Sequence, residues 1–358
     1  MSEELAEIIR EEIRRTGPIP FSRWMELCLY HPQYGYYMKP GRKTGYGRDA
    51  DFVTPPTLHP FMGEAVAKEL ADSWRGAGEP GSWRVVEFGG GEGDLARNAL
   101  LWLDRKLPEL ARSILWCHAE LSPEHQRHQF SDDSRIQKIT AFGYGGGPFI
   151  EGEDWQAVIA CEVVDAIPFE VQRWRSGEWQ RLSVATTDSR FEASWLPSEA
   201  PPPWAWAEGA VASEGQQVIH HNFLGPWIAD VPRADTLTMI LIDYGRRGPL
   251  AAGMEAVRAY RAHAHASWLE HPGEVDLTAS VDFSQTSFWA NGFRETAFES
   301  LEAFLLRHGI LDELNKIDRN TVAGASSYLR LRQLLLPSGM GSAFKVQRFD
   351  RIREVPKL

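Results

Sequence analysis

Residues 83–107 leave the chain few possible folds, because an apolar run, a glycine-rich turn and a helical pattern follow one another directly. The run WRVVEF (83–88) is followed by GGGEG, and LARNALLWLDRKL (95–107) then repeats apolar residues at helical spacing. Glycines allow a tight turn and let a ligand approach the backbone closely. The segment therefore predicts a buried strand, a ligand-binding turn and a helix in an α/β protein.

Five further apolar runs have the length of buried strands and are separated by helical patterns. They are ILWCHAE (114–120), IQKITAF (136–142), QAVIACEV (156–163), TLTMILIDYG (236–245) and FKVQRFDRI (344–352). Strands that alternate with helices indicate βαβ units and a mainly parallel sheet.

The length of 358 residues allows a second domain or large insertions. We predict an N-terminal cap with a substrate-side loop over residues 1–80. The sheet core then spans 81–358, with insertions at about 173–235 and 246–285.

Composition predicts a cytoplasmic protein that neither spans a membrane nor binds nucleic acid. The net charge is −11, which opposes binding to phosphate backbones. The three cysteines contain no CxxC pair and fit a reducing compartment. No apolar run approaches the roughly 18 residues that a membrane helix requires.

The charge of the glycine turn indicates which ligand it binds. Gly91, Gly93 and Ala96 have the spacing of a dinucleotide site, but a pyrophosphate requires a helix N-terminus without competing negative charge. Glu87 and two further carboxylates in the turn favour a cationic ligand such as S-adenosylmethionine instead. A phosphate loop is excluded, since the sequence has no Gly-Lys-Ser/Thr.

Three other acids follow predicted strands at the edge where parallel sheets bind ligands. Glu120 ends the second strand and is a candidate for bonding to the ribose hydroxyls; the alternative is a solvated loop carboxylate. Glu162 and Asp165 lie at the carboxyl-terminal edge of the strand QAVIACEV and could orient a nucleophile or take its proton. Their structural alternative is a helix cap at Asp165 and a solvated Glu162.

We predict no metal site and no acyl transfer. The candidate ligands lack HExxH or Cys/His spacing, and no G-x-S-x-G turn occurs. These candidates are His220, His221, His263, His265 and His271.

The sequence resembles the MidA-like S-adenosylmethionine-dependent methyltransferases, a family that includes the mitochondrial complex I assembly arginine methyltransferase. The matching blocks span nearly the whole chain in order. They are GPIPFSRWMELCLYHPQYGYY, DFVTPP, VVEFGGGEGDL, ELSPEHQ, ACEVVDAIPFEV, LIDYG, EAVRAYRAH, PGEVDLTASVDF and MGSAFKV.

The resemblance implies a class I methyltransferase fold: a Rossmann-like sheet of seven strands with an N-terminal helical and loop cap and inserted substrate-side segments. It also implies a cofactor site and a catalytic pair. The cofactor residues are Glu87, Gly89, Gly91, Gly93, Glu120 and Cys161, and the catalytic residues facing the acceptor are Glu162 and Asp165.

The acceptor implied by the family is an arginine of a protein, and a homodimer is possible. Two departures fall on the acceptor side: Thr57 replaces an acid of the family, and Cys161 replaces an asparagine. A small-molecule N- or O-methyltransferase and a cofactor-binding assembly factor without turnover therefore stay as alternatives.

Overall fold

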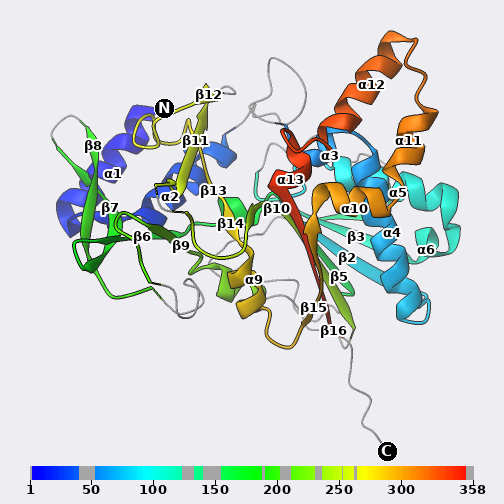
Figure 1. Ribbon diagram of the computed structural model, residues 1–358, viewed down its shortest axis with the longest axis horizontal. Helices are drawn as coiled ribbons and strands as arrows, with labels where there is room; N and C mark the ends of the chain where they lie inside the picture. The colour runs from blue at the N-terminus through cyan, green and yellow to red at the C-terminus, as the bar shows by residue number, and fades with distance from the viewer. Residues whose placement is uncertain are drawn as a thin grey trace, which may run out of the picture.

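A large, mostly parallel β-sheet lies on one side of the molecule and two antiparallel sheets lie on the other (Figure 1). The computed structural model describes residues 2–39, 53–122, 133–139, 155–187, 190–201, 211–229, 236–251, 253–261 and 264–351.

The central sheet has the order β15-β16-β10-β5-β2-β3-β4, and β14 pairs with β10 outside this path. Strands β4, β3, β2, β5 and β10 are parallel, and β16 runs antiparallel to both β10 and β15. The strands are β2 (Trp83–Phe88), β3 (Ile114–Ala119), β4 (Ile136–Ile139), β5 (Ala157–Cys161), β10 (Leu237–Arg246), β14 (Val281–Asp282), β15 (Arg294–Ser300) and β16 (Phe344–Arg351).

The predicted α/β class is confirmed, and the strand number needs a correction. Eight strands occur in the described part of this sheet instead of seven, because the two-residue β14 pairs with the end of β10. A pairing this short leaves no periodic signal in the sequence. The division into domains stays a prediction.

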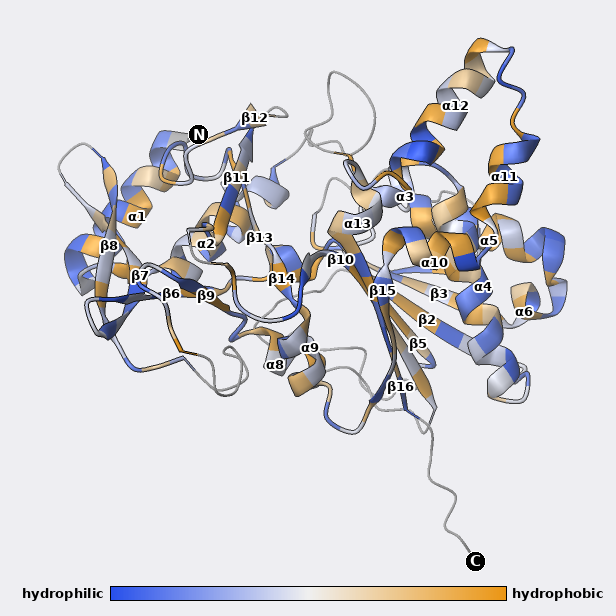
Figure 2. Cartoon of the chain, in the orientation of Figure 1, coloured by the Kyte–Doolittle hydropathy of each residue, from blue (hydrophilic) through white to orange (hydrophobic). Residues whose placement is uncertain are grey.

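Both faces of the inner strands β2, β3, β5 and β10 are buried, which explains why these strands are continuous apolar runs. Val85 packs into the core beneath the helices that precede and follow β2, whereas its neighbour Val86 packs on the opposite face. Helices on the first face include α3 (Pro55–Leu58), α4 (Phe61–Gly76), α5 (Asp94–Lys106), α6 (Pro108–Ser113), α10 (Leu301–Arg307), α11 (Ile310–Lys316), α12 (Val322–Gln333) and α13 (Met340–Ala343). The second face is covered by α8 (Leu224–Ala229) and α9 (Phe283–Trp289), and Figure 2 shows the apolar strands between these layers.

The second side of the molecule joins the N-terminus to two distant segments. Leu5, Trp24, Val184 and Leu277 share one apolar core. The elements on this side are α1 (Ser2–Thr16), β1 (Ile19–Pro20), α2 (Phe21–Tyr30), η1 (Tyr36–Met38), β6 (Glu170–Arg175), β7 (Glu178–Thr186), β8 (Phe191–Ser198), β9 (Gln217–His220), β11 (Val257–Arg261), β12 (Ala264–His265) and β13 (Asp276–Ala279). The short helix η2 (Val164–Ala166) packs instead against the second face of the central sheet through Val164.

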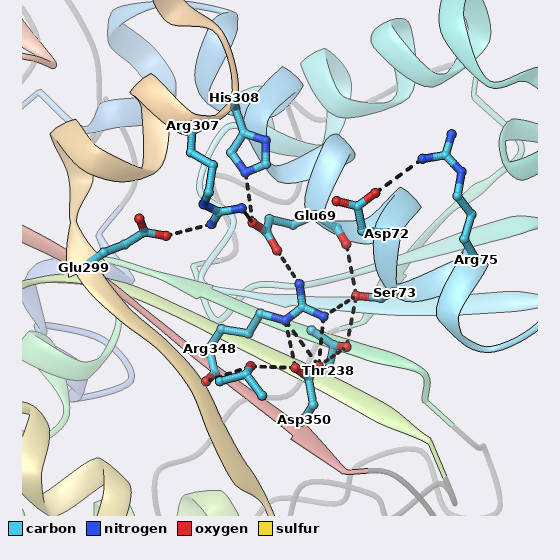
Figure 3. A network of polar contacts seen from close by, with 11 residues as sticks. Glu69, Asp72, Ser73, Arg75, Thr238, Glu299, Arg307, His308, Arg348 and Asp350 are labelled. Atoms are coloured by element: carbon cyan, nitrogen blue, oxygen red, sulfur yellow. Dashed lines mark hydrogen bonds and ion pairs between the residues drawn. The ribbon is translucent and has the colours of Figure 1, made fainter.

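A buried carboxylate fixes α4 to the C-terminal part of the central sheet (Figure 3). Glu69 is 2% exposed and pairs with Arg307 at 2.5 Å, with His308 at 2.9 Å and with Arg348 of β16. Burial alone would raise the pKa of Glu69. The hydrogen bond from His308 and the charges of the two arginines outweigh burial and lower this pKa to about 2.

We expect Glu69→Gln to lower the free energy of unfolding by about 3 kcal/mol at pH 7, the linkage value of a shift from 4.5 to about 2. Because the folded-state pKa is depressed, this contribution is present above pH 4.5 and is lost as the pH falls toward 2. Urea unfolding at pH 7 and at pH 3 measures the difference. Asp72→Asn on the same helix is the control, since the Asp72–Arg75 pair is mostly exposed. An equal effect of both substitutions would contradict the prediction.

Candidate active site

A cavity of about 400 Å³ lies where the carboxyl ends of β2, β3, β5 and β10 meet the second side of the molecule. Its size is that of a small-molecule pocket. The described residues around it include seven acids and a single basic side chain, Arg258. The acids are Glu87, Glu92, Asp94, Glu120, Glu162, Asp165 and Asp276.

The glycine turn forms one wall of this cavity and depends on glycine. Gly89, Gly91 and Gly93 have φ angles of 60°, 55° and 77°, in the region that side chains disfavour. A Cβ on Gly90 would lie 2.2 Å from the ring of His118. The turn therefore keeps its course only while these positions carry no side chain. Gly89 and Gly91 line the cavity, whereas Gly93 begins α5.

Glu120 connects the glycine turn to the end of β3. One carboxylate oxygen accepts a hydrogen bond from the backbone N–H of Gly91 at 2.9 Å, and the other accepts from that of Ser122 at 2.7 Å. The side chain is 7% exposed and lines the cavity. Glu120 is therefore not a solvated loop carboxylate.

Glu87 is held in place at the end of β2. Its Oε2 accepts a hydrogen bond from Trp116 Nε1 at 2.9 Å and lies 3.7 Å from His118 Nδ1. The residue is 1% exposed but contributes to the cavity lining. The side chains of Trp116 and His118 in strand β3 therefore hold the Glu87 carboxylate in its orientation.

Glu162 has an unusual backbone conformation directly after β5. Its φ is 55°, and its N–H donates to Ile242 of the neighbouring strand at 2.8 Å. A side chain at positive φ costs energy and is frequent at functional sites. Within the described structure the buried Oε1 of Glu162 has no hydrogen-bond partner. This unsatisfied oxygen belongs to a residue that lines the cavity.

Asp165 lies in η2 and is oriented by the end of β10. Tyr244 donates its hydroxyl to Asp165 Oδ2 at 2.6 Å, and the backbone N–H of Asp165 donates to Asp243 at 3.1 Å. Asp165 Oδ1 is buried and has no partner in the described structure. Asp243 thus supports the loop that carries Asp165.

Burial disfavours the ionised form of both carboxyl groups. Burial, followed by the charges of Asp165, Asp243 and Asp276, raises the pKa of Glu162 well above its ordinary value. Burial also raises the pKa of Asp165 to about 6, although the hydrogen bond from Tyr244 and the charge of Arg258 act in the opposite direction. Around pH 7, Asp165 is therefore the member more readily ionised.

The opposite wall contains residues that the sequence patterns do not assign to the site. Tyr37, after α2, donates its hydroxyl to Asp276 of β13 at 2.8 Å, and Tyr30 donates to the carbonyl of Ala166 at 2.8 Å. Arg258 of β11 also lines the cavity. Their one signal in the sequence is their position in the family-like blocks, including EAVRAYRAH and PGEVDLTASVDF.

The two departures from the family pattern both border the cavity. Thr57 Oγ1 donates to the Thr54 carbonyl at 2.9 Å and accepts from the Thr54 N–H at 3.1 Å, so it caps the short helix α3. Cys161 is half-buried, and burial raises the pKa of its thiol. Both substitutions leave neutral side chains facing the cavity.

Within the described residues, no cluster of three or more potential metal ligands occurs, and no helix is long and apolar enough to cross a membrane. His263 lies outside the described residues.

A mostly parallel sheet with an acid-rich glycine turn at its carboxyl edge defines a methyltransferase that uses S-adenosylmethionine. The chain belongs to the family described as "Putative S-adenosyl-L-methionine-dependent methyltransferase", whose model matches residues 65–298.

Relatives of known name or structure support this membership. The chain is 28% identical over 305 residues to the protein arginine methyltransferase NDUFAF7 homologue of Drosophila melanogaster, covering 78% of this chain and 68% of the relative. It is 27% identical to the Danio rerio protein arginine methyltransferase NDUFAF7, covering 77% and 69%. A Burkholderia thailandensis protein bound to S-adenosylhomocysteine has a TM-score of 0.81 and 27% identity, covering 98% of this chain and 92% of that one.

These findings contradict the predicted cytoplasmic localisation. The relatives from Drosophila melanogaster, Caenorhabditis elegans, Danio rerio and Homo sapiens are all named as mitochondrial proteins. The inference failed because unpaired cysteines fit any reducing compartment and cannot distinguish one from another.

The cavity also fits the cofactor chemically. S-adenosylmethionine carries an ammonium and a sulfonium, and the glycine turn is bordered by Glu87, Glu92, Asp94 and Glu120. Glycine positions in this turn leave the backbone open to close approach.

Proposed function

We propose that this methyltransferase modifies a nitrogen of an arginine side chain in a protein. The observation that carries the proposal is a pair of buried carboxyl oxygens without hydrogen-bond partners in the described structure, Glu162 Oε1 and Asp165 Oδ1, on two residues that line an acid-rich cavity. A guanidinium brings both positive charge and several N–H donors to such oxygens. The names of the arginine methyltransferase relatives agree with this acceptor.

In this proposal the two walls of the cavity have different roles. Cofactor contacts come from Glu87, Gly89, Gly91, Glu120 and Cys161, and the predicted cofactor residue Gly93 acts through the course of the turn as the N-cap residue of α5. When bound, S-adenosylmethionine supplies the methyl group as an electrophile. Glu162 and Asp165 hold the guanidinium by forked hydrogen bonds, draw its charge away from the reacting nitrogen, and accept the proton that this nitrogen loses.

The raised pKa of Glu162 is compatible with this role. Its proton is favoured while the cavity contains mainly negative groups. Entry of a cation favours the ionised form instead, because opposite charges lower a carboxyl pKa. Binding of a guanidinium would thus generate the carboxylate that orients it.

A second candidate function is a binding or assembly factor that holds the cofactor without turnover. Thr57 favours this candidate, because a threonine that is hydrogen-bonded to the backbone of Thr54 occupies the position where the family pattern has an acid. A small-molecule acceptor is the third candidate, since the cavity volume alone would admit one.

Methyl-labelled S-adenosylmethionine distinguishes the three candidates. The purified protein is incubated with this cofactor and a cell lysate, and the protein fraction is hydrolysed and separated by chromatography. We expect the label in methylated arginine. Label confined to low-mass products would instead establish a small-molecule acceptor. Cofactor binding without any label transfer would favour the binding factor.

A further inference from the structure

Arg258 is the one basic side chain among the described residues that line the cavity, and its place in a site for cations requires an explanation. A fixed positive charge would repel an incoming guanidinium. Such a charge has a use in this cavity if it stabilises the ionised form of a neighbouring carboxyl group.

The guanidinium of Arg258 is held away from direct pairing with those acids. Its Nη2 donates to Ser280 Oγ at 2.6 Å, and its Cζ lies 5.2 Å from the centre of the Tyr244 ring. Tyr244 in turn donates its hydroxyl to Asp165 Oδ2. Arg258 therefore approaches Asp165 through the tyrosine, while the buried Asp165 Oδ1 keeps no hydrogen-bond partner in the described structure.

Burial raises the pKa of Asp165, and the other titratable groups around it are carboxyl groups and tyrosines, none of which carries a positive charge. The charge of Asp165 raises the pKa of two carboxyl groups, at the end of β5 and in β10, and of two tyrosines, in η1 and β10, and a carboxyl group of β13 acts on the first of these carboxyl groups. These groups are Glu162, Asp243, Asp276, Tyr37 and Tyr244. Among the described residues of the cavity lining, Arg258 alone supplies a positive charge that favours the carboxylate.

We propose that Arg258 is a positioning residue that keeps Asp165 the ionised member of the acid cluster. Fixed between Ser280 and the Tyr244 ring, it acts on Asp165 without occupying the oxygen that meets the acceptor. The consequence for catalysis rests on the proposed function, because the ionised Asp165 is the group that would first bind a guanidinium.

The decisive test is a titration of the protein alone, so its result does not depend on the identity of the methyl acceptor. Carbon-13 NMR of carboxyl-labelled aspartate follows the titration of each side chain, and Asp165→Asn assigns the Asp165 signal. We expect a titration midpoint near 6 in the native protein. Arg258→Met keeps an apolar stem but removes the charge, and it should raise this midpoint by about one pH unit.

Two further variants separate charge from packing. Arg258→Lys keeps the charge and should restore most of the shift. Arg173→Met removes an arginine that lies 4.1 Å from the Trp195 ring, outside the cavity, and should leave the Asp165 midpoint unchanged. An unchanged midpoint in a folded Arg258→Met protein would overturn the proposal, as would an equal shift in Arg173→Met.

The pH profile of methyl transfer then links the titration to the reaction. In Arg258→Met, label transfer at pH 6 should fall about fivefold relative to the native protein and recover at pH 8, because a midpoint raised from about 6 to about 7 lowers the ionised fraction at pH 6 from about one half to about one tenth. A loss that is the same at every pH, with the Asp165 midpoint unmoved, would assign Arg258 to packing and overturn the proposal.

Discussion

Glu162→Gln should lower the turnover of methyl transfer about a hundredfold while the affinity for S-adenosylmethionine changes only a few-fold. Glutamine preserves the size of the side chain but cannot ionise. The variant therefore mimics the protonated Glu162 that burial and neighbouring acids favour in the cavity. A large loss would demonstrate that the reaction requires the carboxylate, which forms when a cation enters.

Calorimetry with S-adenosylmethionine and single-turnover label transfer measure the two effects separately. The matched control is Glu170→Gln. Glu170 is a half-buried glutamate whose pKa is raised by burial and which bonds to Ser22, but it does not line the cavity. Release of the cofactor by Glu162→Gln, with turnover preserved at saturation, would place Glu162 in the cofactor site instead.

Gly91→Val should weaken the binding of S-adenosylmethionine by about a hundredfold or more. Gly91 has a φ of 55°, a conformation in which a β-branched residue is a genuine outlier. Its N–H also donates to Glu120, so a shift of the turn would release the carboxylate predicted to bind the ribose. The added side chain would further reduce the open space at the cavity wall.

Gly177→Val is the control for strain alone. Gly177 has a φ of 83° in the turn between β6 and β7, and an added Cβ would meet no atom within 4 Å. Both variants strain the backbone, but only Gly91→Val should lose the cofactor in calorimetry. Cofactor affinity within about tenfold of native in a folded Gly91→Val protein would contradict the predicted cofactor contact.

The strands of the central sheet could be predicted closely because their signals are local. The run at residues 83–88 forms β2 with the predicted bounds, and that at 236–245 forms β10 with a shift of one residue at each end. Parallel strands align their carboxyl ends, so the order of runs and acids along the chain is enough to predict Glu87, Glu120 and Glu162 at one edge. The cavity lining brings these three together.

The sequence contains no comparable local pattern for the residues that form the second wall of the cavity. Tyr37 bonds to Asp276, a residue 239 positions away in the sequence. The two meet because the N-terminal helices share an apolar core with β6, β7, β11 and β13 rather than lying on the central sheet. Periodicity reports which face of an element is buried but not the element that covers it.

The sequence by itself therefore determined the α/β class, the glycine turn and the acids that follow β2, β3 and β5, since each depends on residues adjacent in the chain. Only the tertiary structure decided how deeply each acid is buried, which charges surround it and which side chains lie across the cavity. Those properties depend on burial and on charges from distant segments, such as Arg258 beside Tyr244 and Asp165. Long-range electrostatics of this kind exist only after the chain has folded, because folding both removes water and brings the charges together.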